Sequence, residues 1–99
     1  TLDRSSAASD VYKRQVEEGA DVQYSILMPG TVVKKGAVVA YAIVAEGAVI
    51  EAEATVGAPP SDDPDWGIAV VAGGINVGEK AVVKPSAMVR KNVKGGEQV

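Results

Sequence analysis

Two adjacent seventeen-residue segments of this chain are nearly half identical. Residues 16–32 (VEEGADVQYSILMPGTV) and 33–49 (VKKGAVVAYAIVAEGAV) share eight of seventeen positions, and a third copy opens at Ile50 and is interrupted after Gly57. Self-similarity at a fixed period is typical of solenoids, in which each coil packs only on its neighbours. The repeat therefore predicts a stack of similar coils and excludes most ordinary globular folds.

Within the repeat, apolar residues recur with a period of about six residues. A helix would place them three, four and seven apart, and a plain half-buried strand would alternate at two. Since six is a multiple of two, a short strand and a turn can recur with the same face inward, and we expect three such strands in each coil, about 4.8 Å from the next coil. The residues predicted to point inward are Val16, Val22, Met28, Val33, Val39, Ala45, Ile50, Val56, Val71, Val77, Val83 and Val89. The residues four positions after these markers should share the inward face, namely Ala20, Ile26, Ala37, Ile43, Ala54, Ile75, Ala81, Ala87 and Val93.

The six-residue units of the repeat indicate a particular fold. VEEGAD, VKKGAV, VGEKAV and VKPSAM are similar to the hexapeptide repeat of left-handed parallel β-helices. The resemblance implies an all-β protein, a left-handed parallel β-helix of about four to five coils with one loop excursion. Its handedness is carried by the resemblance alone, because periodicity does not show hand.

The ends of the chain depart from the repeat. Residues 1–15 are polar and Ser-rich, and the string SSAASDVYKRQ resembles translated sequencing-adaptor sequence, so we expect a non-native or disordered segment there. The β-helix is predicted for residues 16–93, with the loop excursion at 58–67 and a C-terminal tail at 94–99. On this interpretation the chain is the C-terminal end of a longer protein.

Two longer stretches are more specific than the hexads. Residues 22–50 and 65–89 resemble the C-terminal β-helix of bacterial glucose-1-phosphate adenylyltransferase, chiefly in the run SILMPG at 25–30, the run YAIV at 41–44 and the acidic interruption that ends in Trp66. The resemblance implies a parent that makes ADP-glucose and pyrophosphate from ATP and glucose 1-phosphate with Mg²⁺, for glycogen biosynthesis. We expect a cytoplasmic protein by default, because the sequence shows no signal-peptide core and no apolar run of membrane length. It further implies a homotetramer in which this module contacts its own catalytic domain and other subunits and transmits effector binding. The family's nucleotide-binding loop and metal-binding carboxylates have no counterpart here, so we expect this piece to be inactive and to hold no cofactor.

Composition excludes several kinds of site. The chain has no His and no Cys, which removes His general bases, Cys nucleophiles and His/Cys zinc sites. Among hexapeptide-repeat proteins this closes the acyltransferase and carbonic-anhydrase-like branches. A net charge of −3 argues against nucleic-acid binding, and no apolar run is long enough to suggest a membrane span. A structural β-helix of another sugar nucleotidyltransferase, or a non-catalytic hexapeptide-repeat protein, stays open as an alternative.

The remaining motifs favour structure over chemistry. The run GGINVG at 73–78 is followed by Glu79 where a phosphate-binding loop has Lys, so these glycines are predicted to be coil corners. The aspartates of the interruption lack the ligand spacing and glycine of an EF-hand and should form a solvated loop. We therefore predict no catalytic, cofactor-binding or metal-binding residue in this chain. Tyr24 and Tyr41 should stack from one coil to the next.

Four residues remain as candidates for contact with a partner. These interface candidates are Trp66, Lys84, Arg90 and Lys91. A single large aromatic such as Trp66 either packs back on the wall of the coils or anchors an interface. The basic residues near the C-terminus are either solvated or in contact with a partner.

Overall fold

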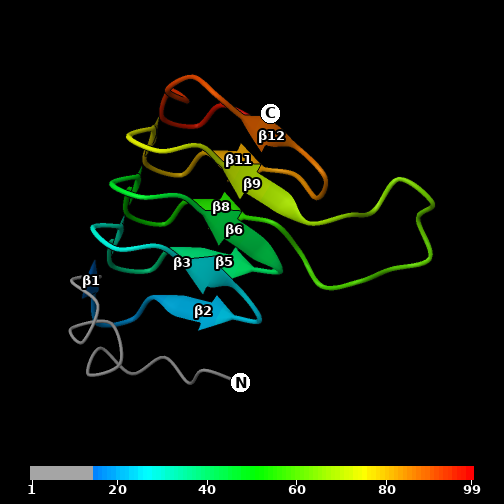
Figure 1. Ribbon diagram of the computed structural model, residues 1–99, viewed down its shortest axis with the longest axis horizontal. Helices are drawn as coiled ribbons and strands as arrows, with labels where there is room; N and C mark the ends of the chain where they lie inside the picture. Colours follow the sequence, from blue (N-terminus) through cyan, green and yellow to red (C-terminus); the bar gives the residue numbers. More distant parts are fainter. Residues whose placement is uncertain (1–14) are drawn as a thin grey trace.

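A column of short parallel strands makes up the part of the chain that the computed structural model describes, residues 15–99 (Figure 1). The regular secondary structure of these residues consists of β-strands, which confirms the all-β prediction. The strands are β1 (Gln15–Val16), β2 (Asp21–Gln23), β3 (Ile26–Leu27), β4 (Val32–Val33), β5 (Val38–Ala40), β6 (Ala42–Val44), β7 (Val49–Ile50), β8 (Thr55–Val56), β9 (Ala69–Val71), β10 (Asn76–Val77), β11 (Val82–Val83) and β12 (Met88–Val89).

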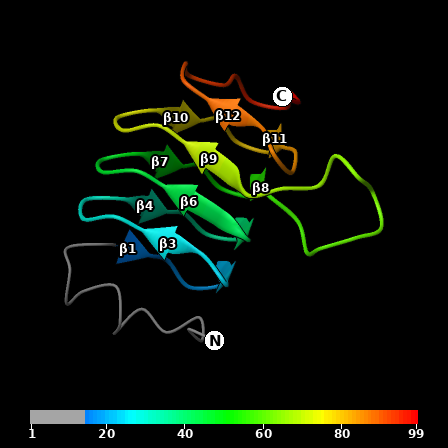
Figure 2. The same cartoon turned by 45° about the vertical axis from the view of Figure 1, so that its right-hand side comes forward.

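Each coil contributes one strand to each of three sheets. Sheet A has the order β1-β4-β7-β10, sheet B has β2-β5-β8-β11, and sheet C has β3-β6-β9-β12, with all neighbours parallel. Figure 2 shows the strands of sheet C stacked one above another. Backbone hydrogen bonds join successive coils, as when Asp21 N donates to Ala37 O at 2.9 Å. The architecture is the parallel β-helix that the repeat predicts.

A column of branched aliphatic side chains fills the inside of the coils. Each strand places a larger aliphatic residue inside the coils, and β6 and β9 also bury Ala42 and Ala69. The larger buried residues are Val16, Val22, Leu27, Val33, Val39, Val44, Ile50, Val56, Val71, Val77, Val83 and Val89. β-Branched side chains suit such positions because they pack well on a pleated surface. Full burial of each is worth about 1.5–3 kcal/mol relative to exposure, so this column is the main source of stability.

The predicted inward residue is wrong at one strand in each of the first two coils. Leu27 and Val44 are 4% and 0% exposed, whereas Met28, predicted to be inside, is 40% exposed. Ala45 is likewise only half-buried. The five-residue step therefore lies between sheets B and C in these coils, and not between sheets C and A.

Two tyrosines occupy the shorter corner. Tyr24 and Tyr41 have φ angles of 48° and 53°, in the left-handed region that non-glycine residues seldom adopt. The chain turns there with one residue fewer than at the later corner that contains Ser86. As a result Ile26, predicted to lie inside, points outward and is 58% exposed, and Ile43 is also outward and half-buried.

The strand pairing places the loop and the two ends of the column. The excursion connects β8 to β9 and projects from one side of the column (Figure 1). At the C-terminal end the coil continues past the predicted limit at residue 93, because Gln98 pairs with Val82. Residues 94–99, predicted as a tail, thus form part of a fifth coil. Gln15 pairs with Val32 in β4, and the rest of the predicted foreign segment, residues 1–14, lies outside the described residues.

Candidate interaction surfaces

The outer side of sheet C carries an uninterrupted apolar ladder. Neighbouring strands place Ile26, Ile43, Val70 and Met88 in register, one above another. Columns of residues flank the ladder on both sides: Tyr24, Tyr41, Ile68 and Ser86 lie where the strands begin, and Met28, Ala45, Ala72 and Arg90 lie where they end. We call these twelve residues face C.

Most of the exposed large apolar side chains of residues 15–99 lie on face C. Seven large apolar side chains of residues 15–99 are exposed, and five of them belong to this face, namely Tyr24, Ile26, Met28, Ile68 and Met88. An exposed patch of this kind is typical of an interaction site in a soluble protein. Sequence reasoning missed it because the five-residue step was placed at the wrong corner, which turned Ile26 and Ile43 inward.

Sheets A and B carry charged side chains on their outer faces, beside outward valines such as Val49 and Val38. On sheet A, Lys34 Nζ lies 3.1 Å from Glu51 Oε1, and Asn76 Nδ2 donates to Glu51 Oε2 at 2.8 Å. The hydrogen bond from Asn76, followed by that from Lys34, lowers the pKa of Glu51 below its ordinary value of 4.5. On sheet B, Asp21 is the first residue of β2 and Lys84 directly follows β11. Face C is therefore distinct in charge from its neighbours.

Three aromatic rings are stacked along the corner between sheets B and C. The ring centroids of Tyr24 and Tyr41 are 4.9 Å apart and nearly parallel, which confirms the predicted stack. Trp66 meets Tyr41 edge to face at 5.9 Å, and its Nε1 donates to Ala58 O at 2.9 Å. The indole is thus half-buried and closes the base of the loop. Its role as an interface anchor stays a prediction.

The acidic loop is solvent-exposed and held by its own turns. Asp65 N donates to Asp63 Oδ1 at 2.8 Å, and Asp63 N donates to Ser61 Oγ at 3.2 Å. Asp62, Asp63 and Asp65 are all exposed. Within residues 15–99 no group of three or more Asp, Glu, His or Cys side chains is arranged to hold a metal ion.

The predicted basic candidates do not form one site. Arg90, which belongs to face C, and the following Lys91 line a cavity of about 460 Å³ together with Met88, Val89 and Val93. Arg90 Nη2 donates to Met88 Sδ at 3.0 Å, which lays the guanidinium along the apolar ladder. The remaining two candidates lie elsewhere: Lys84 follows β11 in sheet B, and Trp66 is on the loop.

Comparison with known families agrees with the coil geometry. A family model described as GlmU-like, C-terminal hexapeptide matches residues 4–78, which is more than half of the chain. The chain belongs to this hexapeptide-repeat family. Its three stacked sheets are therefore those of a left-handed β-helix, and the chain is a β-helix module of the sugar nucleotidyltransferase type. The matched range begins within the segment predicted to be foreign. Searches of curated proteins and of solved structures give no match.

No helix among the described residues is long and apolar enough to cross a membrane.

Proposed function

We propose that this chain is the C-terminal assembly module of a bacterial glucose-1-phosphate adenylyltransferase. The complete cytoplasmic enzyme would transfer an adenylyl group from ATP to glucose 1-phosphate, releasing pyrophosphate and supplying ADP-glucose for glycogen biosynthesis. The runs SILMPG at 25–30 and YAIV at 41–44, together with the acidic loop before Trp66, support this parent over other members of the family.

Face C is the observation that carries the assembly role. A sheet face with four stacked apolar residues gains free energy when another surface covers it, at about 25 cal/mol per Å² of apolar area. On sheet A the ion pair of Lys34 and Glu51 would lose solvent if another surface covered it, and sheet B likewise carries Asp21 and Lys84. The module is therefore proposed to contact its own catalytic domain and other subunits of a homotetramer. These contacts would also transmit effector binding.

The chemistry is proposed to lie upstream of this chain. Adenylyl transfer uses Mg²⁺ to neutralise the phosphates, and carboxylates usually hold that ion. Residues 15–99 offer no suitable cluster, so they do not fit a magnesium site. The catalytic domain that we propose upstream would supply both the metal ligands and the nucleotide loop.

A second candidate is the β-helix of another sugar nucleotidyltransferase. It is favoured by the matched family model, whose description is GlmU-like and does not name the ADP-glucose enzyme. The assembly role would be the same, and only the nucleotide and the sugar phosphate would differ.

The upstream reading frame and an activity assay separate these candidates. We expect the frame to encode a glycine-rich nucleotide loop, and the complete protein with Mg²⁺ to form ADP-glucose from ATP and glucose 1-phosphate. Residues 1–99 alone serve as the matched control and should give no turnover above a buffer blank. A complete protein that uses another nucleotide or sugar phosphate would favour the second candidate, and turnover by residues 1–99 would contradict the assembly role.

The quaternary structure provides an independent check of the parent. Sedimentation of the complete protein at micromolar concentration should give a tetramer. A monomer would contradict the proposed role in subunit contacts.

A further inference from the structure

We propose that face C binds face C of a second copy of this chain across a two-fold axis parallel to the axis of the coils. The inference rests on the proposed function, because it names one subunit contact that the assembly module makes. It is carried by the shape of the ladder and by the distribution of charge at its two borders.

The ladder suits a partner of its own kind. Ile26, Ile43, Val70 and Met88 stand in one straight row on strands that are in register, so the face is flat across all four coils. Two such sheet faces pack about 10 Å apart, with side chains of each entering the gaps of the other. A two-fold contact requires a surface that complements itself, and a flat apolar face meets that requirement.

Charge is almost absent from the centre of the face. Of its twelve residues only Arg90 is charged, and this guanidinium lies against Met88 Sδ at 3.0 Å. A second copy therefore covers face C without burying a carboxylate, whose desolvation would otherwise oppose the contact.

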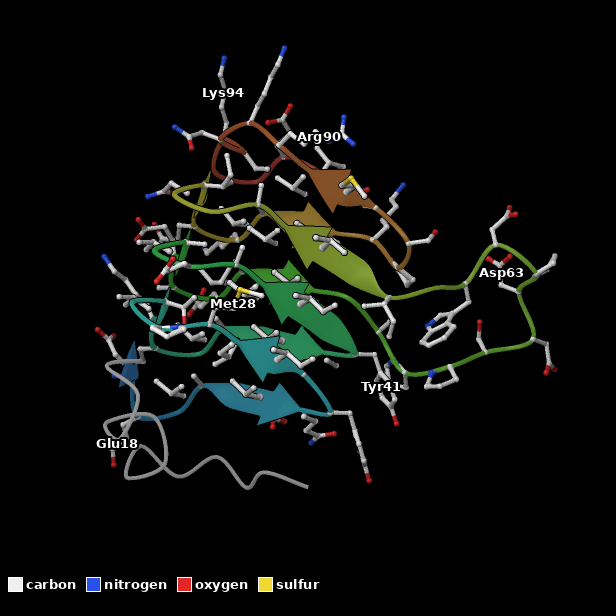
Figure 3. The ribbon with its side chains drawn as sticks, viewed as in Figure 1. Glu18, Met28, Tyr41, Asp63, Arg90 and Lys94 are labelled. Carbon is white, nitrogen blue, oxygen red and sulfur yellow. The ribbon has the colours of Figure 1, made fainter. Side chains whose placement is uncertain are left out.

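The two borders of the face differ in net charge, although the border where the strands end also includes the exposed Glu46, two residues after β6. The acidic loop, with Asp62 and Asp63, enters where the strands of sheet C begin, and Arg90 and Lys91 follow the end of β12. Figure 3 shows Asp63 far out on the projecting loop and Arg90 near the top of the column. A two-fold axis parallel to the axis of the coils sets the strand starts of one copy against the strand ends of the other, so the acidic loop of each copy faces the basic border of its partner. A two-fold axis along the strands would instead place both acidic loops at the same border, which like-charge repulsion disfavours.

The size of the face sets the expected strength. Its twelve residues are fewer than the roughly 20–30 residues that each partner contributes to a stable interface. We therefore expect a weak dimer, with a dissociation constant of about 10–500 µM in low salt. Added salt should weaken it by screening the border charges.

Analytical ultracentrifugation of the 99-residue chain tests the apolar contact. Over about 10 µM to about 1 mM we expect a monomer–dimer equilibrium. Ile43→Glu at the centre of face C should raise the dissociation constant at least about 10-fold. Val38→Glu is the matched control, because Val38 lies outward on sheet B in the same coil and is 37% exposed, and it should change the constant less than about twofold. Far-UV circular dichroism establishes that each variant is folded, and Ile26→Glu, at a position 58% exposed, replaces Ile43→Glu if that variant is not.

A charge exchange tests the orientation. The variants Asp62→Lys/Asp63→Lys and Arg90→Glu/Lys91→Glu should each weaken the dimer by about 3- to 10-fold, and their combination in one chain should restore it. A chain that stays monomeric at about 1 mM, or a dimer indifferent to Ile43→Glu, would overturn the contact. Failure of the combined variant to recover would overturn the parallel two-fold arrangement.

These outcomes are separate from those that test the proposed function. A monomeric chain leaves the accessory role in an adenylyltransferase intact, since that role is judged by the activity of the complete protein. Conversely, a dimer through face C would stand even if the complete protein used another nucleotide.

Discussion

Replacing Thr31 by Val should stabilise the protein. Thr31 is the buried polar residue of the core, fully shielded from solvent, and its Oγ1 has no hydrogen-bond partner within the described part of the chain. The register places Ala48 and Ile75 at the equivalent positions of the next two coils, so the hydroxyl lies in an apolar corner. A buried, unpaired polar group costs about 1–3 kcal/mol. Valine keeps the branched shape and replaces the hydroxyl by a methyl group, so we expect a gain of about 1–2 kcal/mol in the free energy of unfolding.

Urea unfolding measured at equilibrium, with the slope of the transition unchanged, gives this difference directly. In a thermal scan the gain should appear as a rise of about 4–8 °C in Tm for each kcal/mol. Thr55→Val is the matched control, because Thr55 pairs with Val38 and Val82 on the outer side of sheet B, and its effect should stay within about 0.5 kcal/mol. Thr31→Val with a stability equal to or below that of the original chain would show that the hydroxyl is satisfied, and would refute the argument.

Three further changes test the corner geometry, a close approach of coils and a pH effect. Leu27→Ala should lower the free energy of unfolding in urea by about 2–5 kcal/mol, and Met28→Ala by less than about 0.5 kcal/mol, because Leu27 is buried and Met28 is exposed. Equal losses would contradict the assignment of Leu27 as the inward residue. Gly78→Ala should lower Tm by several degrees, since a Cβ there would overlap the backbone of the last coil; an unchanged Tm would show that this coil moves aside freely. Because the pKa of Glu51 is lowered from 4.5, its contribution to stability is complete above about pH 4.5 and is lost as the pH falls through the lowered value. Glu51→Gln should therefore lose less stability than the original chain between about pH 5 and pH 3, and parallel urea midpoints for the two proteins would refute this assignment.

The repeat made the architecture predictable, because each coil in a solenoid makes the same contacts as the last. Spacing alone placed Val16, Val22 and Val33 inside, and the structure agrees. The corner between sheets B and C could not be derived in the same way. Tyr24 and Tyr41 adopt a left-handed backbone at the five-residue corner, and Ser86 adopts it at the six-residue corner, so this conformation does not mark the shorter turn. The stacking of the tyrosine rings is made only once the coils are formed.

The candidate surfaces show the same limit. Trp66 and Arg90 were selected because aromatic and basic residues are often found in interfaces, and the structure shows that each also packs on its own chain. Ile26 and Met88 carry no such signal in the sequence, since an aliphatic residue in a repeat is expected to be buried. Their exposure follows from strand register and corner length, which are three-dimensional properties.

The loop between β8 and β9 makes this column a convenient carrier. Paired residues of β6 and β9 are 27 positions apart, against 17 for β3 and β6, so ten extra residues leave the stack while the pairing continues above and below. The base of the loop is fixed by the bonds from Trp66 Nε1 to Ala58 O and from Ser86 Oγ to Asp65 O at 2.7 Å. A foreign peptide spliced in at the exposed tip, near Asp63, would thus be displayed on a rigid stem whose two ends are already held together, and the coils beneath would fold as before.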